Sequence, residues 1–229
     1  MKTVGLIGGM SWESTITYYQ LLNEGVKAAL GGLHSAKILL YSVDFYEIEA
    51  LMSRGEWDVA AELLGGVAAR LEAAGADMIL ICTNTLHKVA PQVQDRIRVP
   101  LVHIAEAAAD ELAANGITRV GLLGTKYTMT QEFYRDKLTA RGIDVLIPEG
   151  EDIDLVNRVI FDELCLGVVK EDSRAAYLRV IAQLQARGAQ GILLGCTELG
   201  LIVSPADVTL PLFDTTVIHA NKALALALV

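Results

Sequence analysis

Short apolar runs alternate along this chain with segments of helical periodicity. Continuous apolar stretches that end in glycine or polar residues predict buried strands at 3–9, 36–45, 76–82, 118–125 and 191–196. Between them, apolar residues recur at helical spacing, most clearly over 12–30 and 57–74. Continuous apolar strands that alternate with amphipathic helices predict an α/β fold, with mainly parallel sheet covered by helices on both faces.

Two pairs of segments resemble each other within the chain. "GADMILICTNTL" begins at Gly75, and "GAQGILLGCTEL" begins 113 residues later at Gly188. "VGLIGG" begins at Val4, and "VGLLGT" begins 116 residues later at Val120. Buried strands can resemble one another by composition alone, but two matches in the same order with nearly equal offsets indicate two similar halves. The expected halves are 1–104 together with 214–229, and 105–213.

This alignment of the halves assigns different places to two neighbouring residues. It pairs Thr83 with Cys196, and it places Cys82 opposite Gly195. Thr83 and Cys196 would then follow equivalent strands at their carboxyl ends, where open α/β sheets bind ligands. Because side chains alternate along a strand, we expect Cys82 to point away from Thr83 and into the core.

Composition narrows the possible partners and cofactors. The net charge of −9 argues against nucleic acid and acidic membranes, although a local patch can still bind a small anionic substrate. The first strand begins near Val4, which leaves no room for a signal peptide, and no apolar stretch approaches the roughly 20 residues of a membrane span, so a cytoplasmic protein is expected. Three scattered cysteines form no disulfide framework, and the histidines lack metal-ligand spacing. No Walker motif, full dinucleotide fingerprint or lysine in a pyridoxal-phosphate context is present, so no cofactor is expected.

A cleft flanked by two equivalent polar groups suits the inversion of a carbon that carries an acidic proton. One group removes the proton from one face, and the other returns a proton to the opposite face. Thiols suit this chemistry because their ordinary pKa, about 8.5, lies near working pH. Here one position holds a cysteine and the other holds a threonine.

Five motifs together resemble the aspartate/glutamate racemase family. In chain order they are "GLIGGMSWEST", "CTNTLHK", "GLLGTKYTM", "GCTEL" and "PLFDTT". The resemblance implies a cofactor-independent racemase of acidic amino acids, with the active site in the cleft between two similar domains and one catalytic cysteine from each. It also implies a homodimer. "GCTEL" is closer to the aspartate-type branch, since glutamate racemases usually have histidine where Glu198 stands.

The chain departs from this family at the first catalytic position, where Thr83 replaces the usual cysteine. Cys196 takes the second position, which in the family works on the L face. A threonine hydroxyl can give a proton to a carbanion but is poorly suited to removing one from an α-carbon. The expected reaction is therefore directional: Cys196 deprotonates the L-amino acid, and Thr83 protonates the intermediate to give the D form. Cys82 and Cys165 are assigned to the core.

Substrate contacts are expected from the residues that surround these two positions. The candidates are Met10, Ser11, Arg54, Asn84, Thr85, Thr125, Thr128, Thr197 and Glu198. Arg54 resembles the residue that binds the side-chain carboxylate in the family, and Lys170 is expected to assist it. The alternative for Arg54 is an ordinary solvated charge in a loop. Helix capping is the alternative for Ser11, Thr125 and Glu198 and the simplest role for Asp214.

Other functions remain compatible with a single cysteine in a clear catalytic position. Superfamily members with one catalytic cysteine support decarboxylation or maleate-type isomerisation. A non-catalytic amino-acid-binding protein is the alternative from another class. The sequence does not rank aspartate above glutamate.

Overall fold

The computed structural model describes the whole chain, residues 1–229, as two compact units. The first unit comprises Met1–Ile104 and His219–Val229, and the second comprises Ala105–Ile218. The return to the first unit falls inside the last helix, α10 (Thr215–Ala227), whereas the sequence placed it at 214. No helix has both the length and the apolar content that crossing a bilayer requires.

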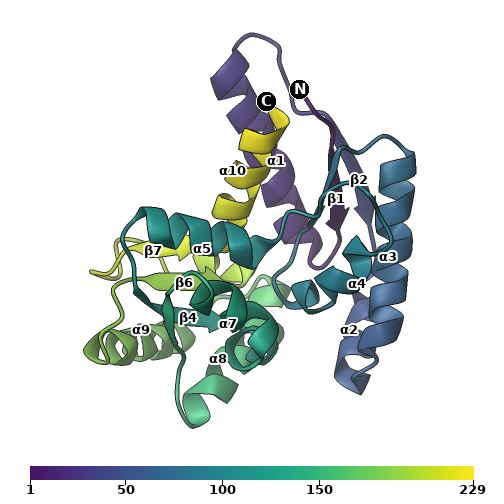
Figure 1. Ribbon diagram of the computed structural model, residues 1–229. Coiled ribbons are helices and arrows are strands. Elements are labelled where there is room, and N and C mark those ends of the chain that lie inside the picture. The colour runs from purple at the N-terminus through teal and green to yellow at the C-terminus, as the bar shows by residue number, and fades with distance from the viewer. The chain divides into compact units, whose positions relative to one another are not determined.

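The first unit is built on a three-stranded parallel sheet of order β2-β1-β3. A helix follows each strand, and α1 and α10 lie on one side of the sheet while α3 lies on the other (Figure 1). Its elements are β1 (Val4–Gly8), α1 (Trp12–Leu30), β2 (Ile38–Ser42), α2 (Phe45–Arg54), α3 (Trp57–Ala73), β3 (Met78–Ile81), the 3-10 helix η1 (Thr85–Val89), α4 (Ala90–Gln94) and most of α10.

The second unit is built on a four-stranded parallel sheet of order β5-β4-β6-β7. Its elements are α5 (Ile104–Ala114), β4 (Arg119–Gly124), α6 (Lys126–Thr130), α7 (Glu132–Thr139), β5 (Asp144–Leu146), α8 (Glu151–Asp162), the 3-10 helix η2 (Leu164–Leu166), α9 (Glu171–Ala186), β6 (Ile192–Gly195), the 3-10 helix η3 (Thr197–Leu201), β7 (Leu212–Asp214) and the start of α10.

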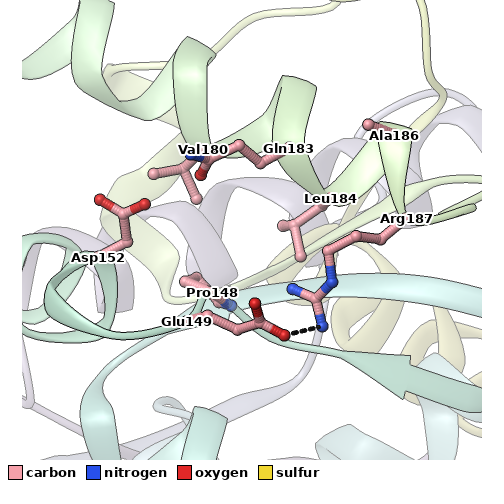
Figure 2. A pocket seen from close by; sticks show the side chains of 8 residues that line it. All are labelled: Pro148, Glu149, Asp152, Val180, Gln183, Leu184, Ala186 and Arg187. Atoms are coloured by element: carbon pink, nitrogen blue, oxygen red, sulfur yellow. Dashed lines mark ion pairs between the residues drawn. The ribbon is translucent and has the colours of Figure 1, made fainter.

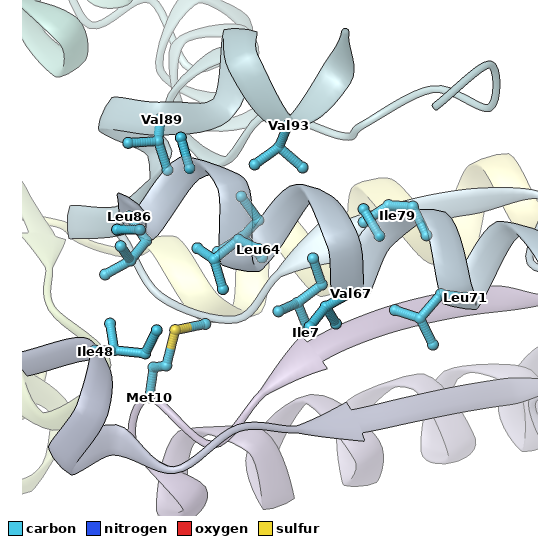
Figure 3. Close-up of a cluster of buried hydrophobic side chains, with 14 of the residues drawn as sticks. Ile7, Met10, Ile48, Leu64, Val67, Leu71, Ile79, Leu86, Val89 and Val93 are labelled. Atoms are coloured by element: carbon cyan, nitrogen blue, oxygen red, sulfur yellow. The ribbon is translucent and has the colours of Figure 1, made fainter. Parts of the chain in front are cut away.

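Strand alternation divides the core of the first unit into two apolar layers. Ile7, Ile79 and Ile81 pack against α2, α3 and the segment from η1 to α4, as Figure 3 shows for part of this cluster. Leu6 and Leu80 pack on the other face against α1 and α10. Both faces are therefore buried at β1 and β3, which is why these strands are continuously apolar, whereas the edge strand β2 is partly exposed.

The two units share the same order of their first three strands and the same pairing of residues between the strands. β1 lies between β2 and β3, and β4 lies between β5 and β6. Gly5 pairs with Ile79 in the first unit, and Gly121 pairs with Ile192 in the second. A Cβ on Gly5 would lie 2.7 Å from Ile79 Cδ1, and one on Gly121 would lie 2.8 Å from Ile192 Cδ1. The prediction of two similar α/β units with parallel sheets is confirmed.

Three elements differ from the sequence prediction. The strand predicted over 36–45 ends at Ser42, because Asp44 accepts a hydrogen bond from Tyr46 N (3.0 Å) and starts α2. The short strands β5 and β7 were not predicted. Each has three residues, too few to establish an alternating or continuous apolar pattern.

Candidate functional site

The first group of predicted site residues lies where β3 ends. Thr83 is half-buried. By strand alternation its side chain falls on the same face as those of Ile79 and Ile81, the face that packs against α3. Cys82 is fully buried in the opposite apolar layer, beside Met78 and Leu80. Burial raises the pKa of the Cys82 thiol, so this residue is neither exposed nor readily ionised. The assignment of Cys82 to the core is confirmed.

The turn after Thr83 is held closely to the rest of the first unit. Asn84 and Thr85 are both buried, and Thr85 begins η1. Cys82 O accepts a hydrogen bond from Ser14 Oγ (3.2 Å), which lies in the first turn of α1. This contact connects the Thr83 turn with the loop between β1 and α1, where Met10 and Ser11 lie.

The loop between β1 and α1 is shaped by Gly9 and Ser11. Gly9 has φ of 89°, and a Cβ there would lie 2.2 Å from Val43 O, so only glycine fits. Ser11 Oγ accepts a hydrogen bond from Ser14 N (3.3 Å) and caps α1. Helix capping was the alternative role predicted for this residue. The Met10 side chain is buried beside Ile48 (Figure 3), so this residue can offer a ligand its backbone but not its side chain.

The second group lies where β6 ends, and it contains a thiol and a carboxylate in contact. Cys196 Sγ donates to Glu198 Oε2 at 3.0 Å, and Thr197 Oγ1 donates to the same oxygen at 2.6 Å. Cys196 and Glu198 are both buried. Burial, followed by the negative charge of Glu198, raises the pKa of Cys196 well above that of an ordinary thiol. The group therefore rests as a thiol that is hydrogen-bonded to a carboxylate.

Thr125 and Thr128 occupy the loop after β4, in the same unit. Thr125 Oγ1 accepts from Thr128 N (3.3 Å) and caps α6, and the two hydroxyl oxygens lie 3.2 Å apart. Thr128 is fully buried, and the helix it belongs to has five residues. Both residues shape this loop, and their contact with a ligand stays a prediction.

The two cations singled out from the sequence each have an acidic neighbour. Arg54 is exposed and is the last residue of α2, and its guanidinium makes two hydrogen bonds to Glu56, at 2.9 and 3.0 Å. Lys170 Nζ lies 3.3 Å from Glu163 Oε1, just before α9. A carboxylate ligand would have to compete with these pairs, so both roles stay predictions.

The end of β6 is also tied to the start of α10. Asp214 Oδ1 accepts from Thr216 N (2.8 Å), so Asp214 acts as the predicted N-cap, and burial raises its pKa. Thr215 Oγ1 donates to Leu194 O at 2.8 Å, two residues before Cys196. No site role was predicted for this threonine, because only the fold brings it to β6.

A histidine that the sequence did not place in the site contacts the Thr83 turn directly. His87 Nδ1 lies 2.8 Å from Thr83 O, and the ring is almost completely buried. Its position four residues after Thr83, in a short polar segment, is the signal that could have identified it.

Other features of the units do not add to these two groups. No cluster of three or more histidine, cysteine, aspartate or glutamate side chains could hold a metal ion. A cavity of about 320 Å³ opens in the second unit between the β5–α8 connection and α9 (Figure 2). It contains none of the predicted site residues, and its Glu149 and Arg187 pair with each other at 3.0 Å.

Comparisons with known proteins agree with one another. The sequence matches the family described as Asp/Glu/Hydantoin racemase over residues 7–223. It is 21% identical over 231 residues to a broad-specificity amino-acid racemase from Bacillus subtilis (strain 168), covering 97% of this chain and 96% of that protein.

Two solved structures cover 100% of this chain and of their own chains. A protein from Yersinia pestis, provisionally described as an Asp/Glu racemase, is 56% identical with a TM-score of 0.95. An aspartate racemase homologue from Pyrococcus horikoshii OT3 is 36% identical with a TM-score of 0.87. The chain therefore belongs to the Asp/Glu/Hydantoin racemase family and is an amino-acid racemase.

Proposed function

We propose that this protein converts the L forms of acidic amino acids, aspartate or glutamate, into their D forms by 1,1-proton transfer without a cofactor. The observation that supports it most directly is the contact between Cys196 and Glu198 at the end of β6. At the equivalent position of the first unit, at the end of β3, stands the hydroxyl of Thr83. The two positions thus offer one acid–base pair and one hydroxyl donor.

In this proposal, Cys196 and Glu198 together form the base for the L-enantiomer. The thiol proton moves from Cys196 Sγ to Glu198 Oε2, along a hydrogen bond of 3.0 Å that already exists. The thiolate then takes the α-proton, and the electron pair of the C–H bond stays on the substrate as a planar carbanion. Storing the proton on Glu198 avoids a free thiolate beside a carboxylate, which burial and like charge disfavour.

Thr83 completes the inversion from the opposite face of the α-carbon. Its Oγ–H bond breaks as the new α-C–H bond forms, and the hydroxyl regains a proton from solvent. A hydroxyl is too weakly acidic to act as a resting base near neutral pH, so Thr83 does not start the reverse reaction efficiently. Turnover from the L form is therefore faster than turnover from the D form at saturating substrate. The KM values differ in the same proportion, because an equilibrium constant of unity keeps kcat/KM equal for the two enantiomers.

Hydrogen-bond donors near both positions are suited to an anionic substrate. In the first unit, Ser11, Asn84 and Thr85 gather around the turn after β3 and the start of α1. Helix amino ends favour anions because their first N–H groups lack helical partners. We assign the α-carboxylate to this group of residues and to Thr125 and Thr197, and we assign the second carboxylate to Arg54.

The test is exchange of the α-proton in D₂O, followed by NMR and chiral chromatography for both enantiomers of aspartate and glutamate. The wild type is expected to incorporate deuterium into L substrate and to release D product, and Cys196→Ser is expected to lose both activities. Cys82→Ala, at the fully buried cysteine of the first unit, is the control and is expected to keep the exchange activity of the wild type. Release of CO₂, or ligand binding without any exchange, would instead identify a decarboxylase or a binding protein.

A homodimer in the cytoplasm belongs to the same proposal, and it rests on the family resemblance. Sedimentation of the purified protein tests the dimer.

A further inference from the structure

The carbonyl groups of the Thr83 turn are each held by a defined donor. Cys82 O accepts from Ser14 Oγ at 3.2 Å, Thr83 O lies 2.8 Å from His87 Nδ1, and Asn84 O accepts from His87 N at 3.1 Å. Two of the three donors belong to His87, its ring Nδ1 and its backbone N–H. The ring is the side chain that holds the carbonyl of Thr83 itself.

The partners of His87 define its tautomer. Thr83 O can only accept, so Nδ1 must carry the proton and donate to it. The other ring nitrogen, Nε2, accepts from Ile104 N at 3.2 Å and must therefore be unprotonated. Burial lowers the pKa of His87 to about 4, outweighing the backbone carbonyl groups near the ring, so the neutral form persists at working pH.

A second histidine packs against the ring of His87. His219, on α10, lies with its ring centroid 5.6 Å from that of His87 in an edge arrangement. Its Nε2 donates to Val102 O at 2.7 Å, so its Nδ1 accepts the hydroxyl proton of Tyr18, also at 2.7 Å. These neutral groups fix the surroundings of His87 without placing a charge in the core of the first unit.

We infer that His87 is a positioning residue for Thr83, and that its Nδ1–H bond to the Thr83 carbonyl sets where the hydroxyl stands for proton delivery. The inference rests on the proposed function. It concerns the step in which Thr83 protonates the intermediate, because His87 contacts the Thr83 turn.

A misplaced Thr83 would have a distinctive kinetic signature. Cys196 would still remove the α-proton of the L substrate and return a deuteron to the same face. The substrate would therefore exchange its α-proton without inverting. The ratio of D product formed to deuterium incorporated into L substrate measures how well Thr83 is placed. A general loss of folded enzyme lowers both quantities equally and leaves this ratio unchanged.

Two substitutions of His87 separate its hydrogen bond from its volume. His87→Leu removes the donor, and we expect the ratio to fall by about tenfold to a hundredfold, the scale that small misplacements produce. His87→Asn retains an N–H donor near the Nδ1 position, and we expect recovery to within about threefold of wild type. Should His87→Leu fail to fold, His87→Gln replaces it, because its amide can accept from Ile104 N while its donor is displaced from Thr83 O.

Tyr18→Phe is the matched control, since it removes a buried hydrogen bond from the same cluster but none from Thr83. It is expected to lower the melting temperature and leave the ratio unchanged. An unchanged ratio in folded His87→Leu or His87→Gln, or an equal fall in Tyr18→Phe, overturns the inference. A wild type that exchanges no α-proton overturns the proposed function instead, so the two failures are distinguishable.

Discussion

Cys196 Sγ lies 3.0 Å from Glu198 Oε2, and the thiol donates to the carboxylate. Taken alone, this contact leaves little thiolate at working pH, because burial and the neighbouring charge of Glu198 both raise the pKa of Cys196. The same contact makes Cys196 an effective base if the carboxylate can take its proton. The chemistry proposed for the second unit depends on which of these effects governs the rate.

Glu198→Gln separates the two effects. The neutral amide removes the negative charge, so the pKa of Cys196 should fall and alkylation of Cys196 by iodoacetamide at pH 8 should become faster. Racemisation should nevertheless slow by about 100-fold or more, because the amide cannot store the proton. Mass spectrometry follows the alkylation, with Cys196→Ser as the control for the labelled site. Racemisation as fast as in the wild type would show that Glu198 only suppresses the thiolate.

Changing Thr83 should alter the direction of the reaction rather than its existence. Thr83→Cys provides a second thiol, and kcat for the D-enantiomer should rise by about tenfold or more relative to kcat for the L-enantiomer, with the KM for the D-enantiomer rising in proportion. Thr83→Val keeps the shape without the hydroxyl and should retain deuterium exchange into L substrate while losing D product. Stopped-time chiral chromatography of both enantiomers measures these rates. No gain in the D direction for Thr83→Cys would remove Thr83 from the mechanism.

Much of the fold followed from patterns that extend over many residues. The helix predicted over 12–30 matches α1 (Trp12–Leu30), and the apolar strands match β1, β3, β4 and β6 to within two residues at each end. The internal alignment correctly separated Cys82 from Thr83, because side-chain alternation and burial act together in a strand covered on both faces. Short strands and the helix that Asp44 begins were missed, since a few residues carry no measurable period.

The local chemistry around the site could not be predicted in the same way. The contact between Cys196 and Glu198 depends on the turn of η3, and the bond from His87 to Thr83 depends on the turn of η1. The Glu56 partner of Arg54 is only two residues away, yet the helix end that aligns the two charges was not visible in the pattern. Contacts of this kind depend on local backbone geometry rather than on residue spacing alone.

Cys82 should affect stability but not turnover. It is fully buried among Leu6, Met78 and Leu80, so Cys82→Ala should lower the free energy of unfolding by about 1 kcal/mol through lost packing. Its specific activity per folded molecule should stay within about twofold of wild type, a change of under half a kcal/mol in barrier. Urea denaturation and the exchange assay measure the two quantities on the same sample. Loss of exchange in a folded Cys82→Ala protein would contradict the assignment of this thiol to the core.

Two adjacent glycines in α3 should respond differently to alanine. A Cβ on Gly66 meets no atom within 4 Å, so Gly66→Ala should raise the free energy of unfolding by about 1 kcal/mol through helix propensity alone. A Cβ on Gly65 would lie 2.9 Å from Arg96 Cγ, and displacement of that side chain should offset part or all of the gain. Thermal unfolding should place the Gly66→Ala protein about 2–4 °C above the wild type. An equal gain at Gly65 would show that Arg96 moves at no cost.

Acidification should destabilise the first unit through its buried histidines. Burial lowers the pKa of His87 to about 4 and that of His219 to about 3, against an ordinary value of 6.5. Between pH 6.5 and 4 the unfolded chain therefore binds protons on these rings that the folded chain does not bind, so the free energy of unfolding falls as pH falls. Each histidine contributes a slope of up to about 1.4 kcal/mol per pH unit, and His87→Asn should reduce the total slope by about that amount.

Urea unfolding at several pH values measures the slope, and His34→Asn, at an exposed histidine, is the matched control. A slope in His87→Asn equal to that of the wild type would mean that His87 can accept a proton within the fold, which contradicts the hydrogen bond that Nε2 receives from Ile104 N.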